Sequence, residues 1–195
     1  MSIRIKTMIV IFLTFLTLLG IFFFTSRWFL LHDAIVSEEG STTRDVTRLL
    51  AAVDDQIEVM DSIVGDWAPW DDTFAFINSG DPAYIASNLS DATFTNLGVE
   101  LMLFINNSGQ IVFGKMVDLE SGAEIPIPES LTSELQVGSR LLSQKDPADK
   151  LAGILPLPDG ALIISSQPIS TSQGEGPMRG TLIMGRRLDE AQSTL

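Results

Sequence analysis

The stretch Asp66-Trp67-Ala68-Pro69-Trp70-Asp71-Asp72 marks the point where a long helical pattern ends. It holds two of the three tryptophans of the chain. Each buried tryptophan removes on the order of 150–250 Å² from water, worth roughly 4–6 kcal/mol. Pro69 stops or sharply bends a helix, because proline lacks the amide hydrogen that helix bonds need. The stretch therefore predicts either a tightly packed structural cluster at a helix end or the aromatic wall of a binding pocket.

The residues before this stretch carry a repeating apolar pattern that is typical of a helix. Apolar side chains recur at alternating steps of four and three residues, which places them on one face. Residues 41–43 (Ser-Thr-Thr) could open this helix, and Gly40 could loosen its join to the preceding segment. Two interpretations stay open, namely a single amphipathic helix laid on the domain core and a dimer-forming stalk continuous with a membrane helix. The stripe consists of Val46, Leu50, Val53, Ile57, Met60, Val64 and Trp67.

The apolar segment near the N-terminus predicts a membrane anchor. In residues 8–24, thirteen of seventeen side chains are Ile, Leu, Val or Phe, and their insertion free energies sum to roughly −4 to −8 kcal/mol. We expect a transmembrane helix over residues 8–31, with residues 1–7, including Arg4 and Lys6, in the cytoplasm and the rest of the chain outside. A cleaved signal peptide is the alternative, although this apolar core is longer than usual and no small-x-small cleavage site follows it.

The charge and the residue inventory exclude several classes of function. The chain holds 25 acidic and 12 basic residues, and three of the bases precede Asp33, so residues 33–195 carry a net charge of −16. A surface this acidic repels nucleic acid. The absence of cysteine excludes disulfides and thiolate metal sites. His32 is the single histidine and lies at the expected membrane edge, so no Ser-His-Asp triad exists. We expect no cofactor and no metal site.

Beyond Pro69 the pattern changes from short helices to strands. Short helices are expected from Asp81-Pro82 toward Asn88 and over residues 91–97. Residues 118–128 have the composition of a loop, and a helix is expected to begin at Leu188. Consecutive strands joined by tight turns predict a mainly antiparallel sheet of about five strands, hence an α+β domain backed by the long helix. The expected strands cover residues 101–105, 111–113, 151–155, 161–166 and 181–186, and a further short helix covers 129–137.

Candidate binding residues gather around the two tryptophans. Aromatic walls and a few polar groups are typical of ligand pockets. The plainer interpretation is that the tryptophans plug the helix end into the core while the aspartates cap the next turns. A catalytic carboxylate pair is disfavoured, because the adjacent residues Asp71 and Asp72 point apart on a helix or a strand. The candidate ligand-binding residues are Trp67, Trp70, Asp71, Asp72, Tyr84 and Asn88.

Three segments together resemble a known sensor family. Asp66-Trp67-Ala68-Pro69-Trp70-Asp71-Asp72-Thr73-Phe74-Ala75-Phe76 looks like the motif D-W-x-x-W-D-D-x-[YF]-x-F, and Tyr84-Ile85-Ala86-Ser87-Asn88-Leu89 resembles the next conserved segment of the family. The run from Gly176 to Asp189 resembles its closing signature. The family is the fourth class of CHASE domain (cyclase/histidine-kinase-associated sensory extracellular), and the resemblance covers roughly residues 45–190.

The resemblance implies a fold, a topology and no catalytic residue. Such domains have a PAS-like fold of the Cache type, lie between two membrane helices, and precede a cytoplasmic HAMP linker and an output module. By this resemblance, residues 32–190 form the extracytoplasmic sensor domain, and residues 191–195 start a helix toward a second membrane span missing from this chain. We therefore expect the chain to be a fragment. Structural or signalling roles are expected for Asp66, Pro69, Gly185, Arg186 and Asp189.

The expected function is that of a sensor in the inner (plasma) membrane, with its domain in the periplasm or outside the cell. It would bind an unknown small molecule or a periplasmic protein, form a homodimer, and relay a signal to a cytoplasmic diguanylate cyclase, phosphodiesterase or histidine kinase module. Two alternatives stay open: a protein-interaction module that holds no small molecule, and a membrane-anchored hydrolase.

Overall fold

The computed structural model describes residues 3–158, 160–174 and 177–188, apart from the side chains of residues 29–45. The chain divides into two compact units, Met1–Ala51 and Ala52–Leu195. In its described residues the first unit is helical throughout, whereas the second holds the sheet and the remaining helices.

Helix α1 spans Ile3–Trp67 without a break. Its first part, Ile3–Trp28, has a mean hydropathy of 2.6 and is long and apolar enough to cross a membrane. It overlaps the span expected at residues 8–31. The expectation that a helix opens at residues 41–43 is wrong, since α1 continues through Gly40. A glycine in a helix costs only about 1 kcal/mol relative to alanine, and once a helix is nucleated each further residue adds a hydrogen bond.

The chain turns at Pro69, as the sequence predicts. Helix α1 ends at Trp67, and α2 (Asp71–Ser79) begins after Trp70. The C-cap of α2 is Gly80, whose φ of 61° is a left-handed conformation that favours glycine.

Two further short helices confirm the expected caps. Helix α3 (Pro82–Asn88) begins after Asp81, whose carboxylate accepts a 2.9 Å hydrogen bond from the amide of Ala83. Helix α4 (Asp91–Leu97) ends at Gly98 in the left-handed conformation, φ 64°.

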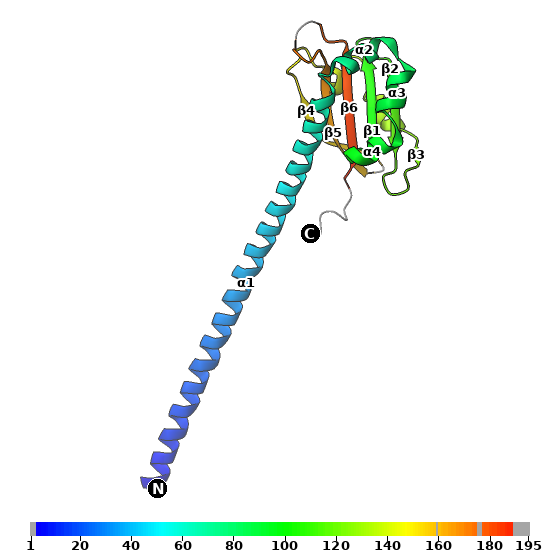
Figure 1. Cartoon of the computed structure of the whole chain (residues 1–195). Coiled ribbons are helices and arrows are strands. Elements are labelled where there is room, and N and C mark those ends of the chain that lie inside the picture. The colour runs from blue at the N-terminus through cyan, green and yellow to red at the C-terminus, as the bar shows by residue number, and fades with distance from the viewer. Residues whose placement is uncertain (1–2, 159, 175–176, 189–195) are drawn as a thin grey trace. The chain divides into compact units, whose positions relative to one another are not determined.

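The strands form one antiparallel sheet in the order β3-β2-β1-β6-β5-β4. The last strand along the chain, β6, lies between β1 and β5 near the middle of the sheet (Figure 1). The strands are β1 (Leu101–Asn106), β2 (Ile111–Val117), β3 (Glu124–Ile125), β4 (Leu151–Leu157), β5 (Gly160–Ile169) and β6 (Gly180–Arg187).

Several assignments differ from the sequence-based expectation, since α2 was not expected and β2 and β5 run on to Val117 and Ile169. Two further differences concern short segments. The described sheet has six strands rather than five, because the segment expected as loop contains the two-residue strand β3. Helix α5 covers only Glu129–Ser133 and not residues 129–137, and the short 3-10 helix η1 (Arg140–Leu142) follows it. Both segments are short and polar, and tertiary pairing rather than apolar periodicity decides their structure.

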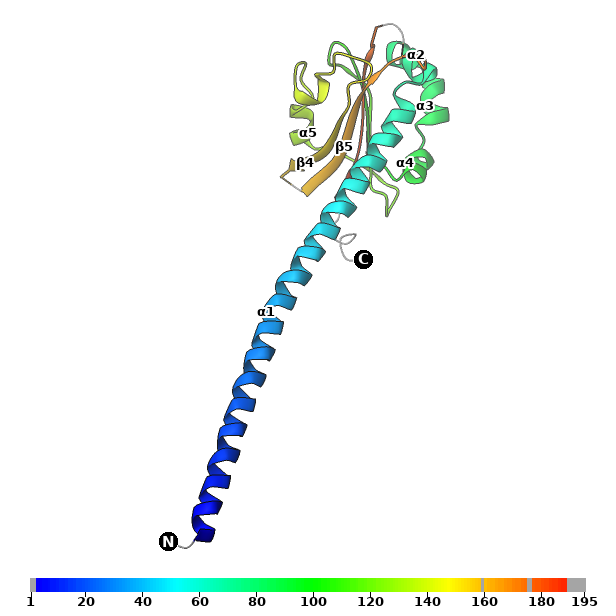
Figure 2. The same ribbon diagram turned by 90° about the vertical axis from the view of Figure 1, so that its left-hand side faces the viewer.

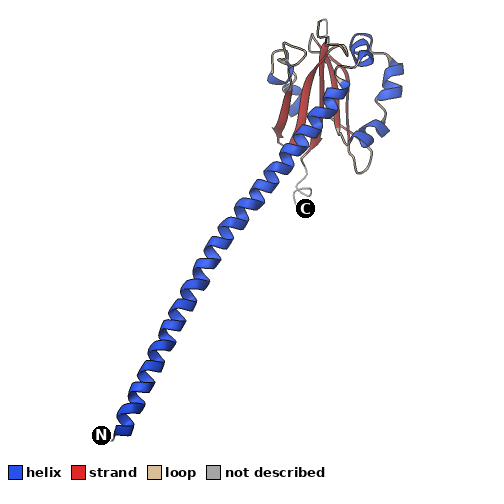
Figure 3. Ribbon diagram, turned by 60° about the vertical axis from the view of Figure 1, so that its left-hand side comes forward, coloured by secondary structure: helices blue, strands red, loops and turns tan. Residues whose placement is uncertain are grey.

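The sheet separates two hydrophobic clusters. Figures 2 and 3 show helices on both sides of the sheet, with α2, α3 and α4 on one face and α5 on the other. The first cluster includes Met60 and Val64 of α1 together with Met102 and Met184 of the sheet. The second cluster includes Leu131 of α5. Successive apolar residues of β1, β5 and β6 belong to the two clusters in turn, as expected for a sheet that is covered on both faces. This confirms the interpretation of residues 101–105 as a strand buried on both faces.

The helix expected from Leu188 lies almost wholly outside the described residues. Leu188 itself follows β6 and donates a 2.8 Å hydrogen bond from its amide to the Ala161 carbonyl.

Candidate functional site

The two tryptophans belong to a row of aromatic rings that leads from the end of α1 into the core. Trp67 meets Trp70 edge-on at 5.9 Å between ring centroids, and Trp70 lies 6.3 Å from Tyr84. Tyr84 stacks on Phe76 at 4.4 Å, and both rings meet Phe104 of β1 edge-on. We call these five residues the aromatic row. Each such pair adds about 0.5–1.5 kcal/mol beyond its area burial.

The aromatic row is filled inside and reaches solvent at Trp70. Tyr84 is 7 % exposed and Trp70 39 % exposed. The Tyr84 hydroxyl shares a buried hydrogen bond of 2.7 Å with the Thr73 hydroxyl. Burial raises the pKa of Tyr84, and the nearby charge of Asp72 adds to this rise against the lowering effect of the Thr73 hydrogen bond. The inner part of the aromatic row is therefore a packed part of the hydrophobic core with a structural role.

The three aspartates of the Asp66–Asp72 stretch have different surroundings in the structure. Asp71 accepts hydrogen bonds of 2.9 Å from both the amide and the hydroxyl of Ser172, in the loop between β5 and β6, and these bonds lower the pKa of Asp71. Asp66 and Asp72 are exposed, and Asp72 lies in the first turn of α2, where a negative charge suits the helix dipole. Asp71 thus ties the start of α2 to the loop that leads into β6.

The other sequence candidates are dispersed. Asn88 ends α3 and donates a 3.0 Å hydrogen bond to the hydroxyl of Ser87. The Arg186 guanidinium donates to the Gln56 side chain on α1 at 3.2 Å. Gly185 lies in β6, where an added Cβ would come 3.0 Å from the Ile163 carbonyl. Asp189 lies outside the described residues.

Two cavities are found elsewhere in the second unit, and no residue of the Asp66–Asp72 stretch lines either. The larger, about 500 Å³, lies beside the β1–β2 turn, and we call it the turn cavity. The smaller, about 270 Å³, lies where β6 ends, between Arg187, Leu188 and Pro128. The ligand-binding role of the Trp67–Asp72 group therefore stays a prediction. The polar residues that line the turn cavity are Asn106, Asn107, Gln144, Lys145 and Thr181.

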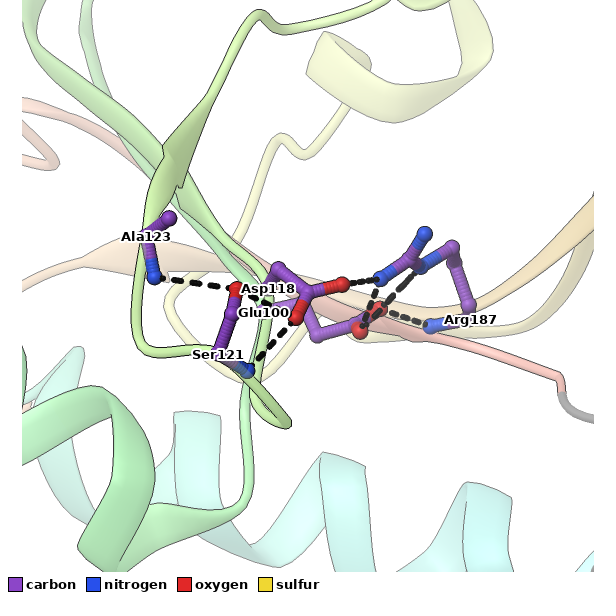
Figure 4. Close-up of polar contacts among 5 residues, drawn as sticks. All are labelled: Glu100, Asp118, Ser121, Ala123 and Arg187. Atoms are coloured by element: carbon purple, nitrogen blue, oxygen red, sulfur yellow. Dashed lines mark hydrogen bonds and ion pairs between the residues drawn. The ribbon is translucent and has the colours of Figure 1, made fainter.

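An ion cluster that the sequence did not reveal fixes the end of β6 (Figure 4). The Glu100 side chain is only 5 % exposed and receives the Arg187 guanidinium at 2.8 Å and the Arg187 amide at 2.7 Å. Asp118 binds the same guanidinium at 2.9 Å, while the amide and hydroxyl of Ser121 donate to its carboxylate. These bonds lower the pKa of Asp118 to about 2. The only hint in the sequence was an acid, Glu100, flanked by apolar residues.

A second polar link joins α1 to the sheet. The Asp61 carboxylate accepts hydrogen bonds from the Ser165 hydroxyl at 2.9 Å and the Gln167 amide at 2.7 Å, and it pairs with Lys150 at 3.1 Å. Burial works against these bonds, which together leave the pKa of Asp61 lowered. This half-buried carboxylate fixes the position of α1 along β5.

A comparison with protein-family models decides the family. The model of the CHASE4 domain matches residues 52–194, nearly the whole second unit. The chain belongs to the CHASE4 family. The resemblance seen in the sequence is therefore confirmed. With its apolar N-terminal helix, the chain is a membrane-anchored sensory domain.

Known proteins agree with this assignment. The chain is 33 % identical over 156 residues to the methanogenesis regulatory histidine kinase FilI of Methanothrix harundinacea, a match covering 80 % of this chain but 18 % of that protein. Its fold is similar to a domain of a protein assigned to the sensory box/GGDEF family of Vibrio parahaemolyticus (TM-score 0.57, 12 % identity, 78 % and 61 % of the two chains). It is also similar to the extracellular domain of a protein assigned as the histidine kinase vpHK1S-Z8 (TM-score 0.56, 12 % identity, 75 % and 56 %).

Proposed function

We propose that this CHASE4 chain is the extracytoplasmic sensory domain of a signal-transduction protein in the inner (plasma) membrane, with residues 32–190 in the periplasm or outside the cell. The family match over residues 52–194 carries the proposal. Arg4 and Lys6 precede the apolar helix, and a positive charge at that end favours a cytoplasmic N-terminus.

The signal would pass to a cytoplasmic histidine kinase or diguanylate cyclase module. The support is that FilI is a histidine kinase, although the match to this chain covers only 18 % of its length. Within the chain, β6 is the last described strand, and it is hydrogen-bonded along both edges. A change caused by ligand or partner binding could therefore be transmitted along β6, which is held rigidly in the sheet.

We further propose that the sensor is a homodimer that pairs through the heptad stripe of α1. The C-terminal members of the stripe, Met60 and Val64, are buried in the domain core, whereas Val46 and Leu50 are 50 % and 61 % exposed. Exposed apolar residues at heptad spacing form a seam for a second helix of the same kind.

Membrane topology provides the test. Alkaline phosphatase fused after Leu188 is active only if the fusion point has left the cytoplasm, and we expect activity. As a matched control, the enzyme fused after Lys6 should be inactive. An active control with an inactive Leu188 fusion would reverse the orientation, and an N-terminus mapped beyond Phe24 in the mature protein would show a cleaved leader instead of an anchor.

A protein-interaction module is the second candidate, and exposed Trp70 favours it. Trp70 offers a partly exposed ring at the end of the aromatic row, and tryptophans are frequent anchors of protein interfaces. A chimera that joins residues 1–195 to the second span and kinase core of a reporter receptor separates the two. A response to small molecules alone favours a ligand sensor, whereas a response only to added protein, lost in Trp70→Ala, favours the interaction module.

A further inference from the structure

We propose that the turn cavity binds a small organic carboxylate, held by Lys145 and Thr181. The inference rests on the sensory function proposed above and names its ligand class. The cavity lies on the α5 side of the sheet, away from the aromatic row. Its volume of about 500 Å³ falls in the usual range of small-molecule sites, roughly 300–1,000 Å³.

The floor of the turn cavity offers a hydroxyl without a protein partner. Thr181 in β6 is opposite Ile105 and two residues before Ile183, and both isoleucines belong to the cluster on the α5 side. Since paired and alternate strand positions share a face, Thr181 points to that side too. It lines the cavity and is 8 % exposed, and its hydroxyl makes no hydrogen bond with a described residue. The hydroxyl is therefore available to donate a hydrogen bond to a molecule in the cavity.

A second unpartnered polar atom lies in the cavity wall. The amide nitrogen of Gln144 donates to the Ser166 hydroxyl at 2.8 Å and to the Leu141 carbonyl at 3.0 Å, which fixes the side chain. Its Oε1 is buried and has no partner among the described residues. This oxygen is an acceptor, so it would not bond a carboxylate, and the Thr181 hydroxyl is the donor that the cavity floor offers to such a ligand.

The charge of the lining selects an anion. Among the described residues that line the turn cavity there is no Asp or Glu, although residues 33–195 carry 25 acids. Lys145 is the charged residue of the lining. Asp149 of the same loop is engaged by the backbone amides of Lys145 and Asp146 at 2.8 and 3.0 Å. The Lys145 charge also contributes to the lowered pKa of Asp149, but the Lys145 ammonium forms no ion pair with a described residue.

The remaining lining favours an apolar body on the ligand. A carboxylate facing Lys145 and Thr181 would place the rest of the molecule against side chains that cannot hydrogen-bond. Burial of that part supplies affinity, whereas the polar contacts fix the orientation. These apolar lining residues are Val137, Leu142, Pro147, Pro168, Pro177 and Met178.

Ligand-dependent melting of the full chain in detergent tests the proposal. The probes are straight and branched monocarboxylates from acetate to hexanoate, with hexanamide as the uncharged match. At about tenfold excess over Kd we expect a rise in Tm of about 3–6 °C for at least one carboxylate, and no rise for hexanamide. No shift for any carboxylate would overturn the proposal.

Three variants locate the site. Lys145→Gln and Thr181→Val should each raise Kd about tenfold, since each removes one charge-assisted contact. Lys150→Gln removes the same charge from a lysine of the same loop that does not line the cavity, and its Kd should stay within about twofold. Circular dichroism confirms folding of each variant. Unchanged binding in both cavity variants places the carboxylate elsewhere and overturns the assignment, while the fusion and chimera experiments judge the sensor function separately.

Discussion

Gly180, the first residue of β6, has no room for a side chain. A Cβ there would overlap the Ile105 carbonyl oxygen on β1 and press on Ile77 of α2. Neither neighbour can yield easily, because one is backbone and the other is packed in the core. Gly180 is therefore required by packing rather than by a turn.

Substitution of this glycine tests the packing. We expect Gly180→Ala to lower the free energy of unfolding by about 3 kcal/mol, the upper range for overpacking. Gly153→Ala is the matched control, since Gly153 lies in β4 with nothing within 4 Å of its added Cβ, and we expect it to be neutral or to stabilise by about 0.5 kcal/mol. Urea unfolding of both variants measures the difference, and equal values would contradict the close approach.

The hydrogen bond between Thr73 and Tyr84 tests whether the inner aromatic row is structural. Thr73→Val and Tyr84→Phe should each cost about 1–2 kcal/mol, because each leaves one buried hydroxyl unpaired. The double variant should cost little more than one single variant, a coupling of about 1 kcal/mol that thermal unfolding can resolve. Strictly additive losses would show that the two hydroxyls do not depend on each other.

At the residue scale, the sequence predicts helix caps well, but it predicts poorly which side chains from distant segments contact each other. Asp81 and Gly98 could be assigned because their roles depend on neighbours along the chain. Glu100 and Thr181 could not, because their partners and surroundings come from elements far away in sequence. Arg186 was expected to have a role only through the family resemblance, whereas its neighbour Arg187 forms the ion cluster.

At the scale of elements, the end of β6 is fastened to the start of β1 by Arg187. Arg187→Ala leaves the Glu100 carboxylate buried without its cation. We expect a loss of about 2–3 kcal/mol, at the low end for broken buried pairs because the Arg187 side chain is itself 42 % exposed. Arg186→Ala removes a single 3.2 Å contact and should cost below about 1 kcal/mol. Similar losses in thermal unfolding would rule out a special role for the cluster.

The same cluster predicts an acid dependence of stability. The pKa of Asp118 is lowered to about 2 in the folded chain, so its stabilising effect is complete above the unfolded value of about 4. The effect is lost as the pH falls from about 4 to about 2. Asp118→Asn should therefore flatten the fall of Tm over that window, whereas Glu120→Gln, in the same loop, should not. A slope unchanged in Asp118→Asn would contradict the assignment.

Element types followed from local patterns, but the sheet order did not. The hairpin of β1 and β2 was predicted because Asn106 to Gly109 is a turn sequence between apolar runs, and Asn106 indeed accepts hydrogen bonds from Ser108 and Gln110. The insertion of β6 between β1 and β5 rests on contacts between distant segments. The turn cavity is lined by residues of β1, β5 and β6, which that insertion brings together, so no local motif could predict it.

At the scale of the whole molecule, the heptad stripe predicts a dimer. The full chain in detergent should sediment as a dimer, and Leu50→Glu should shift it to monomer, because a charge in an apolar helix seam is costly. Glu58→Gln, an exposed position outside the stripe, should leave the dimer intact. A strict monomer at high protein concentration, or a dimer unaffected by Leu50→Glu, would refute pairing through this seam.

The position of β6 also decides how the domain responds to force. Eight residues of β6 pair with β5 and six with β1, and the chain continues from the end of this strand. A pull applied there loads all of these bonds in parallel, in shear, rather than peeling them apart one by one. Such a pull would therefore shift β6 as a single unit before it could unravel the sheet.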